Sequence, residues 1–454
     1  MMFKTDSQTI RDLELFGERK NQSSVFSIYN CTKTRGGQDL LYRIFNSPVS
    51  DIEFLENRRD EIRFFAENDC RLSLNPRSVD YIEYYLNIRR VPLKANILDA
   101  TVAGLSNKIN PDNDYFVITE SIIHIAQLLA DLKGFIGRAR EHTLTRTFGS
   151  HLEEVESFCR AKAIVRLIGN QPKKAQDLGY NQINKYDNYF RVKDKEAFRN
   201  LMTVVYEIDL LQSMAGLVMS GGFSLPEYVS SPEPVFIVSD SFHPFLDKPV
   251  RNGFEFKGTA NLCFLTGPNM SGKSTFLKTM GLLVYISHCG LPVPAREFKT
   301  SVMGGLFSTI NLADNINLGY SHFYAEVSRV KEIASLLLNR DRNLVIIFDE
   351  LFRGTNVKDA FDASLGIIDS LSRIRNNFFF ISTHILEVAE NLGDRESILF
   401  RCFESELVNH HAVYDFRLKE GISSERVGMK ILERENVMSI LDKAIVEQSK
   451  KRKE

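Results

Sequence analysis

The sequence contains no tryptophan, only six cysteines and no excess of charge of either sign. The cysteines lie far apart, and none belongs to a CxxC pair or to a Cys/His cluster with metal-ligand spacing. This excludes a disulfide framework and a cysteine-based zinc site. We expect six buried thiols in a reducing compartment, namely Cys31, Cys70, Cys159, Cys263, Cys289 and Cys402.

Long apolar runs are also missing. No segment approaches 18 uninterrupted apolar residues, so the sequence predicts no transmembrane helix, and the charged N-terminus is too polar for a signal peptide. Lys and Arg number 57 and Asp and Glu 58, which gives a formal net charge of −1. A protein that coats nucleic acid over its whole surface is normally more basic. We predict a soluble, cytoplasmic protein with no membrane partner, whose DNA contacts, if any, come from local basic patches.

The 454 residues suffice for two or three domains, and the two halves of the chain differ in pattern. Residues 1–222 show apolar residues at the three- and four-residue spacing of helices. They include a long helix expected at about 194–219 that ends at Ser220-Gly221-Gly222, where glycine permits left-handed backbone. Residues 223–454 alternate short β-rich runs with helical stretches. We therefore predict two domains, 1–222 and 223–454.

One predicted helix of the first half follows Asp51, which is placed to cap its N-terminus. Leu55, Ile62 and Phe65 would point inward, whereas residues 58–61 (Arg, Arg, Asp, Glu) would largely face solvent or a partner.

The β-rich runs of the second half predict an α/β layer with a largely parallel central sheet, because strands alternate with helices. The expected strands are Pro234–Val238, Leu262–Thr266, Val302–Ile310, Leu344–Phe348, Phe378–Ser382, Ile398–Phe400 and Val413–Phe416.

A phosphate-binding loop follows the second of these strands. Strand, GxxxxGK[ST] loop and amphipathic segment occur in the order that such a site requires. Glycines let backbone N–H groups surround phosphate oxygens at a helix N-terminus. Lys273 would reach the β- and γ-phosphates, and the Ser274 hydroxyl would bind Mg²⁺. The predicted nucleotide-binding residues are Gly267, Pro268, Asn269, Met270, Ser271, Gly272, Lys273, Ser274 and Thr275.

Two carboxylates follow the apolar run Leu344–Phe348. Consecutive acids at the end of a buried strand are costly without a charge that neutralises them. Asp349 would hold the metal, directly or through water, and Glu350 would act as general base on the attacking water. This pair therefore predicts hydrolysis of the bound nucleotide rather than binding alone.

His384 follows the strand Phe378–Ser382 and should lie at the same edge of the sheet. A lone histidine is usually structural. Next to a phosphate-binding loop, it can instead hydrogen-bond the γ-phosphate or the lytic water, so we include His384 in the predicted catalytic site.

Together these motifs resemble the ATPase domain of MutS-type DNA mismatch-repair proteins. The loop TGPNMSGKST is similar to that of the family. Further similar segments are His243-Pro244, Val293-Pro294-Ala295, Leu318–Glu326 (LGYSHFYAE), Asp349–Asn356 (DELFRGTN) and Ser382-Thr-His384. The resemblance places Ser321 at the serine that reaches the γ-phosphate of a partner subunit.

The first half also resembles this family, at the entry to its lever or core domain. The similar segments are Asn30–Leu41, Pro48–Asp51 and Arg58–Ile62. Lever-like sequence begins within the first thirty residues, so we expect the mismatch-recognition and connector domains to be absent. Phe54-Leu55-Glu56 spells the Phe-x-Glu wedge of the family, but it falls inside the lever helix, where we expect Phe54 in the core. Pro249–Asn252 lies where the family has an aromatic residue that stacks on adenine.

The resemblance implies a P-loop ATPase domain of the ABC type, with a mixed, mainly parallel sheet, preceded by an all-α lever/core domain. It further implies ATP and Mg²⁺ as cofactors, and a homodimer or a heterodimer with another MutS-like chain. Our leading hypothesis is a DNA-associated ATPase of repair or recombination without its own mismatch readout. The alternatives are a nucleotide-controlled structural or regulatory dimer with no direct DNA role and, third, a small-molecule P-loop kinase.

Overall fold

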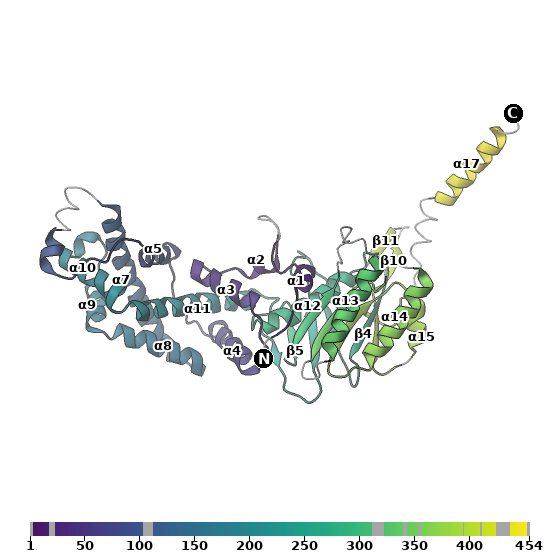
Figure 1. Ribbon diagram of the computed structural model, residues 1–454, viewed down its shortest axis with the longest axis horizontal. Coiled ribbons are helices and arrows are strands. Elements are labelled where there is room, and N and C mark those ends of the chain that lie inside the picture. The colour runs from purple at the N-terminus through teal and green to yellow at the C-terminus, as the bar shows by residue number, and fades with distance from the viewer. Residues whose placement is uncertain are drawn as a thin grey trace.

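The protein is elongated, with a helical half and an α/β half joined end to end (Figure 1). The computed structural model describes residues 3–17, 23–102, 112–310, 322–338, 343–352, 356–393, 395–408, 411–423 and 436–451. We use "helical half" for the described residues up to 222 and "α/β half" for those from 223 onward.

The helical half is built from helices only, apart from isolated bridges. Its elements are α1 (Ser7–Asp12), α2 (Val25–Tyr29), α3 (Arg35–Asn46), α4 (Ile52–Glu67), α5 (Pro76–Leu86), α7 (Asn113–Ala139), α8 (Arg146–Cys159), α9 (Lys162–Asn170), the 3₁₀ turn η1 (Ala175–Asp177), α10 (Tyr180–Asn188), the π-helical turn η2 (Tyr189–Lys193) and α11 (Lys195–Met219). Figure 1 shows α11 running from the far helices towards the α/β half.

The α/β half alternates strands and helices. Its strands are β1 (Glu227–Tyr228), β2 (Phe236–Ser241), β3 (Asn252–Glu255), β4 (Leu262–Thr266), β5 (Glu297–Thr300), β6 (Gly305–Thr309), β7 (Leu344–Phe348), β8 (Phe378–Ser382), β9 (Ile398–Cys402), β10 (Ser405–Val408), β11 (His411–Tyr414) and β12 (Lys419–Glu420). Its helices are α12 (Lys273–His288), α13 (His322–Leu337), α14 (Val357–Ser372), α15 (Leu386–Leu392) and α17 (Val437–Lys451).

The main sheet has six strands in the order β12-β9-β4-β8-β7-β6. All neighbours pair in parallel except β12, which pairs with β9 antiparallel. A second sheet has the order β1-β5-β2-β3. The six-stranded main sheet is thus mixed and mainly parallel, and the α/β class is confirmed.

The central strands are buried on both faces, which explains their continuous apolar sequences. In β4, Cys263 and Leu265 face the core shared with α12 and the helical half, whereas Leu262 and Phe264 face the core under α13, α14 and α15. The predicted bounds of β4, β7 and β8 are confirmed, because each apolar run ends where polar residues must reach the sheet edge.

The predicted helix ends in the helical half are confirmed. Asp51 caps α4 by accepting a hydrogen bond from the Phe54 N–H, a contact that typically contributes about 1 kcal/mol. Leu55, Ile62 and Phe65 are buried. The long helix α11 ends at Met219, followed by Gly221 and Gly222 at φ of 82° and 103°.

The prediction that Phe54 is a core residue is wrong, because its side chain is 44% exposed. Adjacent helical residues point about 100° apart, and the inward direction belongs to Leu55. Phe54 instead lies one turn before Arg58, whose guanidinium carbon is 4.5 Å from the ring centroid.

The prediction that Arg58 and Arg59 face solvent or a partner is also wrong. Arg58 Nη1 donates to the carbonyl of Cys289 at 2.9 Å, and burial lowers its pKa. Arg59 lies over the ring of Tyr228 at 5.9 Å. Both side chains therefore connect α4 to the α/β half. Helical periodicity predicts which residues face the core of their own domain, but it does not predict contacts with a neighbouring domain.

The N-terminal residues pack on the edge of the main sheet. Lys4 forms a parallel bridge with Gly305 in β6. Asp12 accepts hydrogen bonds from Ser308 Oγ at 2.7 Å and from the Ile310 N–H at 2.9 Å. The segment before α2 thus contacts the α/β half although it precedes residue 222, and the predicted domain limits remain a prediction.

Two described helices, α7 and α11, are long and apolar enough by length and composition to cross a membrane, although the sequence has no uninterrupted apolar run of that length and predicted no transmembrane helix. Of their most apolar windows, 61% and 56% are buried inside the protein. Core helices pass the same test, so these helices are weak evidence for a span.

All six cysteines are unpaired, as predicted. Five are buried, whereas Cys31 is exposed, so the prediction of six buried thiols is wrong at that position. Cys31 follows α2 at the surface, and its thiol donates to the Ile28 carbonyl at 3.4 Å.

Candidate nucleotide site

The glycine-rich loop between β4 and α12 requires unusual backbone angles. Gly267, Met270 and Gly272 have φ of 143°, 68° and 105°. A Cβ on Gly267 would lie 2.7 Å from the carbonyl oxygen of Phe403, so no larger residue fits there. The loop therefore turns tightly at the N-terminus of α12, where backbone N–H groups can bind an anion.

Lys273 closes this loop from inside. Its side chain is buried, and Nζ donates to the carbonyls of Gly267 at 2.8 Å and Pro268 at 3.0 Å. These are contacts that an ammonium group can exchange for phosphate oxygens. Ser271 is also buried, and its Oγ has no hydrogen-bond partner among the described residues.

Asp349 and Ser274 meet next to this loop. Ser274 Oγ hydrogen-bonds Asp349 Oδ2, and Ser382 Oγ donates to Asp349 Oδ1 at 2.5 Å. Ser382 Oγ also accepts from the Glu350 N–H at 2.9 Å. One carboxylate and one hydroxyl are the hard oxygen ligands that Mg²⁺ takes together with substrate phosphates and water.

The next question is whether the described side chains could hold a metal ion without a nucleotide. In the described part of the chain no group of three or more His, Cys, Asp or Glu side chains could hold a metal ion. A dedicated all-protein metal cage is therefore not found there, whereas the Ser274–Asp349 pair fits an ion that shares its ligands with a nucleotide.

Glu350 and His384 form a pair at the same sheet edge. His384 Nε2 contacts Glu350 Oε1, and the Glu350 side chain is 11% exposed. Glu350 has φ of 57°, a left-handed backbone that costs a non-glycine residue of order 1 kcal/mol or more. The residue with this unusual backbone is one that lines the adjoining cavity.

The cavity beside these residues has a volume of about 390 Å³. Asn269, Met270, Gly272, Lys273, Ser274, Thr275 and Glu350 line its polar end. The rest of the lining is mixed: Phe242, Leu246, Val250, Phe276, Phe403 and Phe416 are apolar, whereas Ser241, His243, Lys248, Asn252 and Thr279 are polar or charged. The structure thus brings the predicted loop, Asp349, Glu350 and His384 to one edge of the sheet. Ser321 lies outside the described residues.

Phe416 is a site residue that sequence reasoning missed. No aromatic residue occurs in Pro249–Asn252, but Phe416 comes to the same wall from the connection between β11 and β12. Asn252 holds it in place: its Nδ2 donates to the Phe416 carbonyl at 2.9 Å, and its Oδ1 accepts from the Leu418 N–H at 2.8 Å. More than 160 residues separate the two segments, so no local spacing signals the contact.

Ser382 is the second missed residue. It lies at the end of β8, and because Phe348 of β7 pairs with Ile381, Ser382 comes opposite Asp349. Only the order of neighbouring strands reveals this contact.

His243 also lines the cavity and is buried. Burial lowers its pKa to about 4, with a smaller contribution from the charge of Lys278. Nδ1 accepts from the Phe245 N–H at 3.4 Å, whereas Nε2 has no hydrogen-bond partner among the described residues. The imidazole is therefore neutral at pH 7 and leaves one ring nitrogen for a ligand.

Comparison with known proteins matches both halves of the chain to domains of one family. A family model described as MutS domain III matches residues 8–215, and one described as MutS domain V matches residues 263–453. The chain belongs to the MutS family. This MutS-family chain matches domains III and V of the family. Domain V is an ATPase domain.

Three similar proteins share one name and align with this chain over different lengths. "DNA mismatch repair protein MutS" of Ehrlichia ruminantium (strain Welgevonden) is 22% identical over 94% of this chain and 63% of its own length. The proteins of that name from Anaplasma phagocytophilum (strain HZ) and Aquifex pyrophilus are 29% and 26% identical over 50% and 57% of this chain, and over 27% and 30% of their own lengths. These alignments span less than two thirds of each relative.

Proposed function

We propose that this MutS-family chain is an ATP-binding and ATP-hydrolysing, DNA-associated protein of repair or recombination that works in the cytoplasm. The observation that carries the proposal is the meeting of Lys273, Ser274, Asp349 and Glu350 around one cavity. The arrangement supports a P-loop ATPase of the ABC type. The DNA role comes from the names of the relatives.

In the proposed reaction Lys273 and the backbone of the loop hold the β- and γ-phosphates, and Ser274 and Asp349 hold Mg²⁺. Bound Mg²⁺ neutralises charge on the phosphate oxygens. Glu350 accepts a proton from water as the water oxygen attacks the γ-phosphorus, and the bond to the ADP oxygen breaks, which yields ADP and phosphate. His384 holds the Glu350 carboxylate in position through their contact.

A route from this site to the helical half supports nucleotide control of that half. Helix α12 begins with Lys273, and its far end carries several links to helical residues. Tyr285 Oη donates to the Phe45 carbonyl at 2.5 Å, and Arg58 donates to the carbonyl of Cys289. A shift of α12 on ATP binding would therefore move α3 and α4 directly.

The proposed partner subunit is a second MutS-like chain, identical or not. The family resemblance at Ser321 supports this arrangement, in which Ser321 would reach the nucleotide of the opposite subunit. ATP would favour the closed pair and hydrolysis would release it.

Phe416 should provide the stacking surface for the base. We expect Phe416→Ala to raise the Kd for ATP about 5- to 150-fold, since base–aromatic stacking is worth about 1–3 kcal/mol. The rate at saturating ATP should change little. Equilibrium binding of a fluorescent ATP analogue checks this, with Phe116→Ala, an exposed aromatic of the helical half, as the matched control. Equal Kd values for wild type and Phe416→Ala would rule the stacking role out.

A local basic surface supports the DNA role. Residues 160–199 contain ten Lys or Arg and four Asp or Glu, a net of +6 in a chain whose total is −1. Arg160, Lys162, Arg166, Lys173, Lys174, Lys185 and Lys193 are exposed there. Helices α9 and α10 of this segment lie at the end of the helical half farthest from the α/β half (Figure 1). We call this surface the basic tip.

Reversing three charges of the basic tip should weaken DNA binding. For Arg166→Glu/Lys173→Glu/Lys174→Glu we expect the slope of log K against log salt to become shallower by about 3, because each phosphate contact contributes about 0.9. Binding to duplex, mismatched, branched and single-stranded DNA, titrated with salt, with and without ATP, measures this. The control reverses Arg43, Lys331 and Lys358, which are exposed elsewhere. No binding of wild type to any DNA at low salt would favour the structural or regulatory dimer instead.

A further inference from the structure

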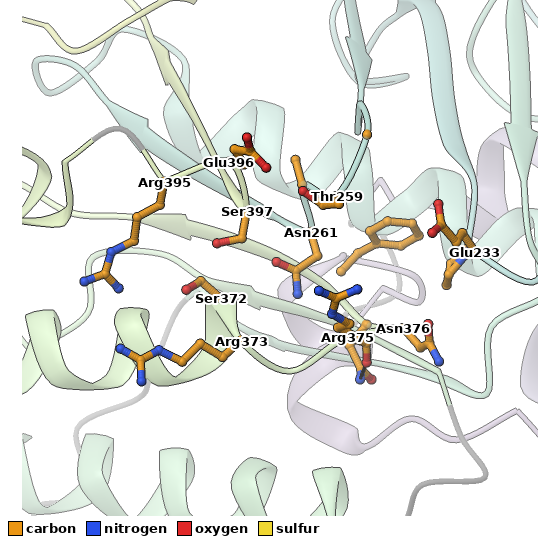
Figure 2. A pocket seen from close by; sticks show the side chains of 15 residues that line it. Glu233, Thr259, Asn261, Ser372, Arg373, Arg375, Asn376, Arg395, Glu396 and Ser397 are labelled. Carbon is orange, nitrogen blue, oxygen red and sulfur yellow. Dashed lines mark hydrogen bonds between the residues drawn. The ribbon is translucent and has the colours of Figure 1, made fainter.

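A second cavity, of about 590 Å³, is lined by the residues drawn in Figure 2. It lies at the opposite edge of the six-stranded sheet from the nucleotide site. The residues that line it precede strands: Gly258–Asn261 before β4, Arg375–Asn377 before β8, and Arg395–Ser397 before β9. These strands are parallel, so their N-terminal ends meet here. None of the lining residues belongs to the nucleotide site.

The floor of this cavity is built around a buried amide. Asn261 is 7% exposed, and its Nδ2 donates to the Ile374 carbonyl at 2.8 Å, which fixes the orientation of the amide. Its Oδ1 has no hydrogen-bond partner among the described residues. The neighbouring Asn377, by contrast, uses both of its polar atoms. The floor thus offers one hydrogen-bond acceptor that calls for an N–H or O–H donor.

The rim carries charges of both signs. Arg373 and Arg395 at one end both pair with Asp369. Glu396 follows Arg395 in the lining, and Glu233 lies at the other end. Figure 2 shows Asn261 and Arg375 between the two ends. The exposed Arg375 guanidinium has no carboxylate within ion-pair distance in the described part of the chain. It is therefore the cation available to an anionic group of a ligand.

A nucleotide does not suit this cavity. Among the described lining residues, Phe378 is the one aromatic, and it is 2% exposed, so it offers no ring face for a base. None of these described residues begins a helix, whereas α14 presents its C-terminal end here through Ser372 and Arg373. The cavity calls for an N–H or O–H donor at Asn261 and for an anion at Arg375. A peptide meets both requirements, because its main chain supplies N–H donors and an acidic side chain supplies the anion.

We propose that this cavity binds an extended, acidic peptide segment of a partner protein. A main-chain N–H of the segment donates to Asn261 Oδ1, and a neighbouring carboxylate pairs with Arg375. The segment would lie at the start of β4, β8 and β9, whose other ends carry the glycine-rich loop and His384. Both of these contacts are polar and one is an ion pair at the surface, which predicts weak and salt-sensitive binding.

The probe is a fluorescein-labelled, end-capped peptide of four Gly-Glu repeats, titrated with the full chain at low salt and followed by anisotropy. We expect Arg375→Glu to weaken its binding at least 10-fold, and Arg43→Glu, an exposed arginine of α3, to leave it unchanged. A capped Gly-Ser peptide should bind at least 10-fold more weakly than the acidic one. Unaltered ATP binding by Arg375→Glu verifies that this variant is folded.

Hydrogen exchange separates this cavity from the basic tip, which also attracts acidic peptides. The Gly-Glu peptide should protect residues 372–378 and 395–397, and should still do so in the basic-tip variant. Equal affinity of wild type and Arg375→Glu, or protection at the basic tip alone, would overturn the proposal. Protection of the cavity by ATP or inorganic phosphate but not by the peptide would also overturn it. These readouts do not depend on ATP hydrolysis or on DNA.

Discussion

Replacing Glu350 by glutamine is expected to lower the rate of ATP hydrolysis about 10²- to 10⁴-fold, the range that general-base catalysis typically contributes. Glutamine keeps the size of the side chain and can still hydrogen-bond His384, but it cannot accept the proton of the attacking water. Lys273, Ser274 and Asp349 are untouched, so the Kd for ATP should stay within about 2-fold. Phosphate release and nucleotide binding measured on the same preparation test both statements.

Glu390→Gln is the matched control, because this residue is an exposed glutamate of α15 outside the cavity. It should hydrolyse ATP at the wild-type rate. If phosphate release by Glu350→Gln matched that of wild type, the assignment of Glu350 as base would be wrong. Loss of ATP binding by this variant would instead give Glu350 a structural role.

The largest effect on stability is expected at Asp187 in the helical half. Its carboxylate is fully buried and accepts from Arg191 Nε and Nη2 at 2.6 Å each, from Tyr85 Oη at 3.0 Å and from the Leu93 N–H at 2.6 Å. It thus joins α5, the segment after it, α10 and η2. Asp187→Ala leaves the buried Arg191 without its counter-ion, which should cost about 3–5 kcal/mol of unfolding free energy.

Urea unfolding followed by circular dichroism measures this loss. Asp362→Ala, an exposed aspartate of α14, should stay within about 0.5 kcal/mol of wild type. The double variant Asp187→Leu/Arg191→Met removes both charges and should be more stable than Asp187→Ala. A loss below about 1 kcal/mol for Asp187→Ala would mean that the pair is not desolvated in the folded protein.

Sequence reasoning worked best where one local cause dominates. Strands β4, β7 and β8 are buried on both faces, so their apolar runs alone predict their bounds, and parallel order then brings Asp349 and His384 to the edge where the glycine-rich loop lies. Asp51 predicts the start of α4 because its side chain caps the backbone of its own helix. Each of these predictions needs information from about ten consecutive residues.

Apart from Phe54, where the local helical period already pointed outward, the failures at the two interfaces come from contacts between distant segments. Arg58 looks solvent-facing in its helix, but its guanidinium donates a hydrogen bond to the carbonyl of Cys289. Phe416 reaches the nucleotide cavity through Asn252, and strands as short as β3 and β12 have too few residues to show a period. The cavity around Asn261 assembles from four separate loops, none of which carries a recognisable motif.

The most direct test of an ATPase at this site is phosphate release by the purified full chain supplied with ATP, with and without Mg²⁺ and with and without duplex DNA. We predict saturable, Mg²⁺-dependent release of phosphate, with ADP formed in equal amount, no phosphorylated acceptor, and a rate that DNA changes. ATP that remains intact under all these conditions, or phosphate that appears on an acceptor instead of in solution, would contradict the proposed function.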